Sequence, residues 1–163
     1  MELGKLNKNN NGFTLLETIV AVGLIVVGLI SALALITTSL FYVSNIQDRL
    51  VAANLTAEGI EVVRNIRDNN WLQSKVWNNG LADGDYQVAY DSTILSSFSG
   101  SPLFLDSNGI YNYISSGSAT SYVRKISILN LSSYEIRIIA IVTWQRRGIT
   151  YSNSVEEHLF NWK

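Results

Sequence analysis

The feature that most constrains the fold is an uncharged run of 30 residues between Glu17 and Asp48. From Thr18 to Val43 nearly every side chain is apolar, mainly Leu, Ile, Val and Ala. About 20 apolar residues in a helix cross a hydrocarbon core of ~30 Å. The run is therefore long enough to span a membrane. Glu17 stands at its entrance, where insertion into lipid disfavours a carboxylate, so its presence there needs a reason.

The charges on the two sides of this run predict its orientation. Lys5 and Lys8 precede it with no acidic residue between them, and the first charges beyond it, Asp48 and Arg49, cancel. Cytoplasmic flanks carry the excess of lysine and arginine. We therefore expect the N-terminus in the cytoplasm and the C-terminal bulk of the chain outside.

The helical pattern continues past the apolar run. Apolar residues recur at three- and four-residue steps, which makes one stripe of a helix: Val43, Ile46, Leu50, Ala53, Ala57, Ile60 and Val63. The other faces carry polar residues: Gln47, Asp48, Arg49, Asn54, Glu58, Glu61, Arg64 and Arg67. Both Glu61–Arg64 and Arg64–Asp68 have the spacing of helix neighbours. The pattern predicts one helix over about 13–68, amphipathic in its second half, with the helical signal fading at Asn69-Asn70.

After Trp71 the apolar pattern changes from helical to alternating, which predicts strands. We expect strands over 86–90, 103–105, 110–114, 122–129, 134–144 and 149–162, with turns at 82–85, 106–109 and 145–148 and Ser/Gly-rich loops over 91–101 and 115–121. Asn108-Gly109 between apolar runs is a strong hairpin signal. One face of a strand should hold Ile136, Ile138, Ala140, Val142 and Trp144.

These elements predict an α+β fold with one small sheet. A domain of this size buries limited area alone, so we expect an antiparallel sheet to wrap the amphipathic half of the helix and cover its stripe over 50–63. The four tryptophans, Trp71, Trp77, Trp144 and Trp162, are expected to serve that core.

The composition leaves little material for catalysis or metal binding. The chain has no cysteine, its one histidine is His158, which we expect on a strand, and its net charge is −1. A catalytic triad or a His-based metal cluster therefore lacks residues, and nothing indicates nucleic acid. Asp83, Asp85, Asp91 and Asp106 lack the spacing of a calcium loop, and Arg146-Arg147 is expected in a solvated turn. We expect no enzyme, cofactor or metal site.

Three interpretations of the N-terminus are open. A secretory signal would be cut after Ala34, where Ala32-Leu33-Ala34 fits the small-x-small rule, but the apolar pattern runs straight through this site. An uncleaved anchor explains the span and the lysines. Either one would make the chain a membrane-anchored or secreted β-domain binding protein, and neither gives Glu17 a role.

The third interpretation comes from a resemblance. Gly12-Phe13-Thr14-Leu15-Leu16-Glu17, with its preceding lysines and following apolar run, resembles the processing motif of type IV prepilins and type II secretion pseudopilins. In that family a prepilin peptidase cuts after the Gly of a short basic leader, the new N-terminal residue is N-methylated, and the fifth mature residue is Glu. The resemblance implies cleavage between Gly12 and Phe13, N-methylation of Phe13, and Glu17 as the fifth mature residue.

The resemblance also implies a role for Glu17. The family's apolar helix packs against other helices in a filament core, where the Glu is thought to pair with the terminal amine of a neighbouring subunit. A buried charge is costly unless paired, so the pairing would set the axial register. The implied partners are other pilin or pseudopilin subunits, prepilin peptidase and the bacterial cytoplasmic membrane. The filament would be extracellular or periplasmic.

Further features narrow the comparison within that family. The only proline is Pro102, so the apolar run lacks the central proline of many major pilins, and the absence of cysteine excludes their C-terminal disulfide loop. Residues 58–71 and the tail at 142–144 and 159–162 resemble PilV-like minor pilins. The implied organisation is a leader at 1–12, a transmembrane or filament-core helix at 13–43, its amphipathic continuation at 44–70, and an exported β domain at 71–163. Adhesion pili, DNA-uptake pili and secretion pseudopili share the N-terminal motif.

Overall fold

The computed structural model describes residue 12 and residues 14–162, and it confirms the α+β fold: a long helix and a small antiparallel sheet. The helix, α1, runs Leu15–Leu72. The chain divides into two compact units, Met1–Asn45 and Ile46–Lys163. The first 31 helical residues therefore belong to one unit, and the rest of α1 belongs to the other together with all the strands.

The helix continues four residues beyond the predicted end because its last turn is well capped. Ser74 adopts a left-handed backbone (φ 55°). Its N–H donates to the carbonyl of Trp71 (3.1 Å), while the N–H of Lys75 donates to the carbonyl of Asn70 (2.8 Å). This pair of bonds is a Schellman motif, which satisfies the free carbonyls at a helix end. The side-chain amide of Asn70 also donates to the carbonyls of Trp77 and Asn79 and so holds the following loop.

The sheet is a meander of three long strands with two short ones at its edge. Its strands are β1 (Gly84–Gln87), β2 (Ser96–Ser97), β6 (Val123–Ser132), β7 (Glu135–Arg146) and β8 (Ile149–Phe160), in the order β2-β1-β6-β7-β8 and antiparallel throughout. The turn between β7 and β8 is Arg147-Gly148, with φ of 49° and 78°. Positive φ at both central residues is typical of the type I′ turn that joins twisted strands.

A second, three-stranded sheet is built from two-residue strands: β3 (Phe104–Leu105), β4 (Tyr111–Asn112) and β5 (Ser118–Ala119), in the order β4-β3-β5. The predicted hairpin at 106–109 is confirmed, because β3 pairs with β4 across it and Asp106 accepts N–H bonds from Asn108 and Ile110. The prediction of plain loops over 91–101 and 115–121 is wrong: β2 and β5 lie there. Two-residue strands have no apolar alternation for a sequence pattern to show.

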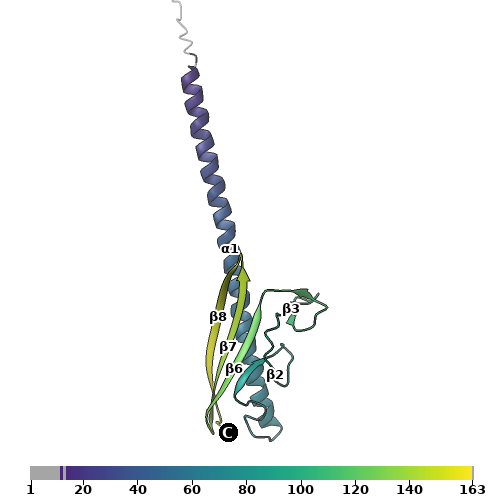
Figure 1. The fold of residues 1–163 in the computed structure, drawn as a ribbon. Helices are drawn as coiled ribbons and strands as arrows, with labels where there is room; N and C mark the ends of the chain where they lie inside the picture. The colour runs from purple at the N-terminus through teal and green to yellow at the C-terminus, as the bar shows by residue number, and fades with distance from the viewer. Residues whose placement is uncertain (1–11, 13, 163) are drawn as a thin grey trace, which may run out of the picture. The chain divides into compact units, whose positions relative to one another are not determined.

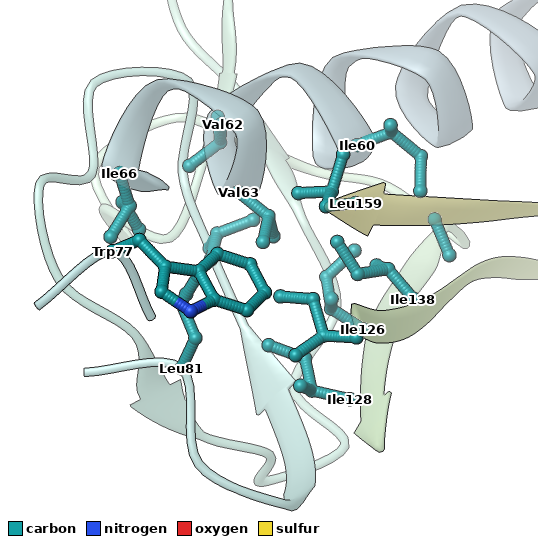
Figure 2. Packing of buried hydrophobic residues seen from close by; sticks show 13 residues of the cluster. Ile60, Val62, Val63, Ile66, Trp77, Leu81, Ile126, Ile128, Ile138 and Leu159 are labelled. Carbon is teal, nitrogen blue, oxygen red and sulfur yellow. The ribbon is translucent and has the colours of Figure 1, made fainter. Parts of the chain in front are cut away.

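The strands β6, β7 and β8 lie alongside the part of α1 that belongs to the second unit (Figure 1). Every second side chain of β7 is buried, and these are the five residues predicted to share a face: Ile136, Ile138, Ala140, Val142 and Trp144. On the helix side, Ile60, Val63 and Ile66 face this layer together with Trp77 and Leu81 (Figure 2). A smaller cluster joins Ala52 and Leu55 to Leu103, Tyr122, Val142 and Trp144.

The predicted helix stripe is confirmed at Ile60 and Val63 and wrong before them. Ile46 and Leu50 are 65% and 61% exposed, and Ala53 and Ala57 are exposed as well. The buried face is instead Ala52, Leu55, Thr56, Gly59, Ile60, Val62, Val63, Ile66, Arg67 and Asn70. Small residues on this face let the sheet approach closely: a Cβ on Gly59 would lie 2.7 Å from Cδ1 of Ile126. Close approach outweighed the size of the apolar side chains in deciding which face is buried.

A buried arginine replaces apolar packing in the middle of this contact. Arg124 on β6 is 0% exposed. Its Nη1 donates to the carbonyl of Leu55 (3.0 Å) and to Oε1 of Glu58 (2.8 Å), and its Nη2 donates to the carbonyl of Val88. A buried charge is tolerated only when it is paired and hydrogen-bonded. Arg124 therefore ties α1 to β6 and to the segment that follows β1.

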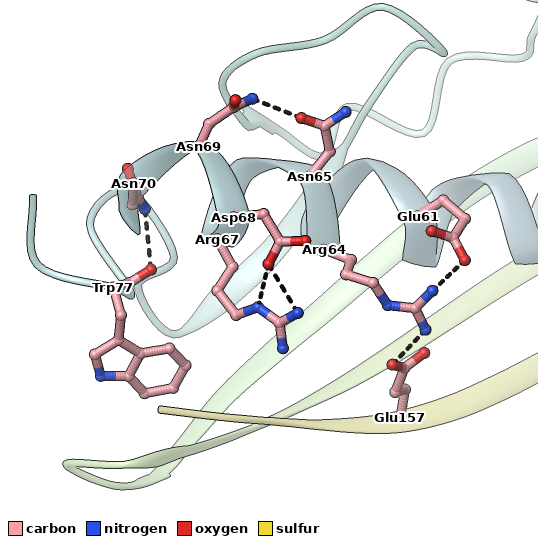
Figure 3. Close-up of polar contacts among 9 residues, drawn as sticks. All are labelled: Glu61, Arg64, Asn65, Arg67, Asp68, Asn69, Asn70, Trp77 and Glu157. Atoms are coloured by element: carbon pink, nitrogen blue, oxygen red, sulfur yellow. Dashed lines mark hydrogen bonds and ion pairs between the residues drawn. The ribbon is translucent and has the colours of Figure 1, made fainter. Parts of the chain in front are cut away.

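Polar contacts near the helix end differ from those expected. Figure 3 shows Arg64 between Glu61 and Glu157, with ion pairs to both. The Glu61–Arg64 pair is confirmed, but Asp68 pairs with Arg67 (2.8 Å) and not with Arg64. Arg67, predicted on a polar face, is buried, with its guanidinium 4.8 Å from the ring centroid of Trp71.

Three of the four tryptophans serve the core as predicted. Trp77 and Trp144 are buried, and Trp71 packs partly buried against the larger cluster. The prediction is wrong for Trp162, which is 66% exposed, although its ring makes an edge-to-face contact with Trp71 (4.7 Å between centroids). It follows the end of β8, where the sheet no longer covers it.

Candidate processing and assembly segment

Thr14 determines where the helix begins. Its Oγ1 accepts the N–H of Glu17 (3.2 Å), and its carbonyl accepts the N–H of Thr18 (3.1 Å). A threonine at the N-cap with a glutamate three residues later is the capping-box pattern. The helix therefore starts at Leu15, not at about residue 13 as predicted. The spacing of Thr14 and Glu17 in the sequence is the signal that predicts this start.

The described residues of the first unit form a helix whose apolar side chains are mostly exposed. From Leu15 to Val43 its large apolar side chains are exposed, at fractions from 47% for Val26 to 80% for Leu15, except for Phe41, which is half-buried. By its length and apolar composition, this helix could cross a membrane. So much exposed apolar surface marks a site that lipid or protein must cover.

Hydroxyl side chains in this helix are satisfied by its own backbone. Thr18 donates to the carbonyl of Thr14, Ser31 to that of Val27, and both Thr37 and Thr38 to that of Ala34, at 2.8–2.9 Å. A hydroxyl in an apolar medium is costly unless it is hydrogen-bonded. These bonds therefore make the polar residues of the run compatible with either lipid or a packed filament core.

The two glycines of the run, Gly23 and Gly28, pack against none of the residues that the structure describes. A Cβ added to Gly23 or Gly28 would meet nothing within 4 Å. Glycine in a helix interior costs about 1 kcal/mol relative to alanine. If close packing compensates for this cost, the partner belongs to another molecule, as at the small-residue interfaces of membrane helices.

The residues predicted from the processing motif lie at the start of this helix. Gly12 is exposed, with open space where a Cβ would stand. Phe13, the predicted methylation site, lies outside the described residues. Glu17 is exposed in the first turn of α1, where the positive end of the helix dipole favours a carboxylate. Glu17 makes no ion pair with any residue in the described part of the chain.

The titratable side chains of the second unit are predicted to form no metal site. Across residue 12 and residues 14–162, no three His, Asp or Glu side chains could hold a metal together. His158 lies on β8, as predicted, against Glu135 and Glu156 on an exposed face. A hollow of about 450 Å³ beside the end of α1 is lined by amides, a lysine and aliphatic residues, without a carboxylate or a histidine.

Comparison with known proteins supports the interpretation of the N-terminal segment as a prepilin-type processing motif. Residues 7–36 match the family described as the prokaryotic N-terminal methylation motif. The match takes in Gly12, Phe13 and Glu17 and ends inside the apolar run. No curated protein and no solved structure matched the chain. The matched segment supports a pilin-like or pseudopilin-like protein that prepilin peptidase processes and that is anchored in a membrane.

Proposed function

We propose that this protein is a structural subunit of a type IV pilus or a type II secretion-like filament, a minor pilin or pseudopilin of the PilV-like kind. In this proposal the chain resides in the cytoplasmic membrane with its second unit outside. Prepilin peptidase cuts between Gly12 and Phe13, Phe13 is N-methylated, and the helix then enters a filament. The subunit performs no catalysis.

One observation carries the proposal: an uncovered apolar helix that bears a single carboxylate in its first turn. Lipid can cover the apolar surface from Leu15 to Val43, but it offers the carboxylate of Glu17 no partner. A helix bundle can use both, because cleavage before Phe13 creates a cationic amine that a neighbouring Glu17 can pair with. The match of residues 7–36 to the methylation motif supports the same chemistry.

The pairing of Glu17 with a neighbour's N-terminal amine would affect assembly because the filament core excludes water. A carboxylate buried without a partner costs several kcal/mol, whereas a paired and hydrogen-bonded one does not. A subunit in the wrong axial position leaves Glu17 and a neighbour's amine both unpaired. Correct register is therefore favoured without any contact from the second unit.

The first test is the mature N-terminus, by mass spectrometry of protein from cells with and without prepilin peptidase. We expect a chain that begins at N-methylated Phe13 and that keeps its leader when the peptidase is absent. A chain that begins at Met1 in both strains, or at Leu35, would contradict the proposal and leave an anchored or secreted binding protein.

The second test addresses Glu17 itself. Glu17→Val and Glu17→Gln should be inserted and cleaved normally but enter sheared filaments at a small fraction of the wild-type amount. Asp91→Asn, which removes one exposed carboxylate of the second unit, is the matched control and should be incorporated normally. Incorporation of the Glu17 variants at the wild-type level would show that the carboxylate has no assembly role.

A further inference from the structure

A cluster of arginines gathers at one end of the second unit. The tip of the β7–β8 hairpin lies against the turn of α1 that contains Asp48 and Arg49. Arg146 forms an ion pair with Asp48, and the guanidinium of Arg49 stands 5.9 Å from the ring centroid of Tyr151. We call Asp48, Arg49, Arg146, Arg147 and Ile149 the basic end.

The basic end is positively charged and partly apolar. It holds three arginines and one aspartate, and the carboxylate of Asp48 already pairs with Arg146. Arg49 and Arg147 are exposed, and the tip also presents Ile149, which is 57% exposed. Exposed arginine beside an exposed aliphatic side chain is typical of surfaces that enter a lipid interface.

Aromatic rings behind the tip hold it in place. The ring of Trp144 stacks on Tyr151 (5.6 Å between centroids) and lies 6.2 Å from Tyr122. The hydroxyl of Tyr122 donates to Oδ1 of Asp48 (3.3 Å). The hairpin is therefore fixed to the helix turn by packing, an ion pair and a hydrogen bond, and its charges form a defined surface.

The chain itself keeps this surface close to the apolar run. Arg49 follows Val43 by six residues, a rise of about 9 Å along a helix. Even a fully extended chain would separate Arg49 from Asn45 by no more than about 14 Å. The headgroup layer adds roughly 5–8 Å on each side of the hydrocarbon core. Chain connectivity alone therefore keeps Arg49 near the headgroup layer.

We propose that the basic end docks on the anionic headgroups of the membrane that holds the apolar helix, in the stage before the subunit enters a filament. The proposal rests on the membrane-resident stage of the proposed function. An arginine near an anionic surface contributes about 1 kcal/mol, which is about fivefold in a binding equilibrium. The helix anchor makes the contact intramolecular, so a few arginines are enough. The arginines make the docking selective for anionic lipids. Ile149 adds an apolar contact that does not depend on the charge of the lipid.

The test uses the full-length chain in nanodiscs, which contain a membrane of stated composition. Because the chain has no cysteine, Thr150→Cys gives a single fluorophore site next to the tip, and Gln73→Cys gives one about 36 Å further along the helix than Arg49. Quenching by a headgroup nitroxide lipid is compared in phosphatidylglycerol and phosphatidylcholine discs. Arg49→Gln and Arg147→Gln remove charge from the basic end, their lysine counterparts keep it, and Lys75→Gln is a distant charge control.

We expect strong quenching at residue 150 in phosphatidylglycerol, weak quenching in phosphatidylcholine, and little at residue 73 in either. Each glutamine variant at Arg49 or Arg147 should lower the docked-to-free ratio about fivefold in phosphatidylglycerol, while both lysine variants and Lys75→Gln leave it unchanged. Equal quenching in the two lipids, or an equal effect of Lys75→Gln, would overturn the docking alone. A chain that does not enter the nanodisc would contradict the membrane-resident stage, and the docking proposal with it.

Discussion

At the scale of single residues, Ser74 holds a backbone conformation that suits glycine. Its φ of 55° closes the Schellman motif at the end of α1, and a residue with a Cβ pays about 1 kcal/mol or more there. Ser74→Gly should therefore stabilise the fold by about 0.5–1 kcal/mol, measured by urea denaturation. Ser74→Ala keeps the Cβ and should change little. A gain from alanine equal to that from glycine would mean that the hydroxyl, not the backbone, is responsible.

His158 is the residue from which we expect pH dependence. Its hydrogen bond with Glu135, and then the one with Glu156, raise its pKa above the ordinary value of 6.5. A pKa raised by folding gives stability that is fully present below pH 6.5 and is lost as the pH rises through the folded-state pKa. The urea concentration at the unfolding midpoint should decrease as the pH rises from 6 to 8. His158→Gln should make the midpoint depend less on pH over this range. An unchanged slope in the variant would assign the pH dependence to another group.

At the scale of elements, the close contact of α1 with β6 depends on Gly59. A Cβ there would lie 2.7 Å from Cδ1 of Ile126 and 3.3 Å from Cδ of Arg124. Gly59→Ala should destabilise the fold by about 1–3 kcal/mol through overpacking, although alanine favours the helix by about 1 kcal/mol. Adding Ile126→Val, which removes the clashing Cδ1, should recover part of the loss. If the double variant is no more stable than Gly59→Ala, the strain lies at the contact with Arg124.

The buried face of the helix can be tested with a matched pair of leucines. Leu50 belongs to the predicted stripe but is 61% exposed, whereas Leu55 is buried against the smaller cluster. Leu55→Ala should cost about 2–5 kcal/mol, and Leu50→Ala should stay within about 0.5 kcal/mol of wild type. Urea denaturation of both variants decides the assignment, because the opposite order of effects would restore the predicted stripe.

At the scale of the whole molecule, the second unit has what a folded domain needs. Residues 46–163 contain both hydrophobic clusters, Arg124 with its partners, and every strand that the structure describes. We expect this fragment to unfold cooperatively, with a urea midpoint close to that of the full-length chain in detergent. A fragment of residues 60–163 lacks Ala52, Leu55 and Glu58 and should be much less stable. Loss of cooperative unfolding in the 46–163 fragment would mean that the first unit supports the core.

Several parts of the fold could be predicted from residues that are close together in the chain. The uncharged run predicts a helix long enough to span a membrane, and Asn108-Gly109 predicts a hairpin turn. The alternation from Ile136 to Trp144 identified the buried side of β7. Each of these depends on neighbours in the chain, through helix length, turn chemistry or strand pleat.

The buried face of α1 could not be predicted from the sequence, because it depends on how the sheet packs against the helix. Periodicity favoured the face of Ile46 and Leu50, but the sheet packs on the face of Ala52, Thr56 and Gly59, where small side chains allow the backbones to approach. Arg124 could be predicted as a strand residue but not as a buried one, because its partners lie on α1 and after β1, up to 69 positions away in the chain. The basic end likewise brings Asp48 and Arg146 together across 98 positions. Such pairings depend on how closely two surfaces fit, which no local pattern records.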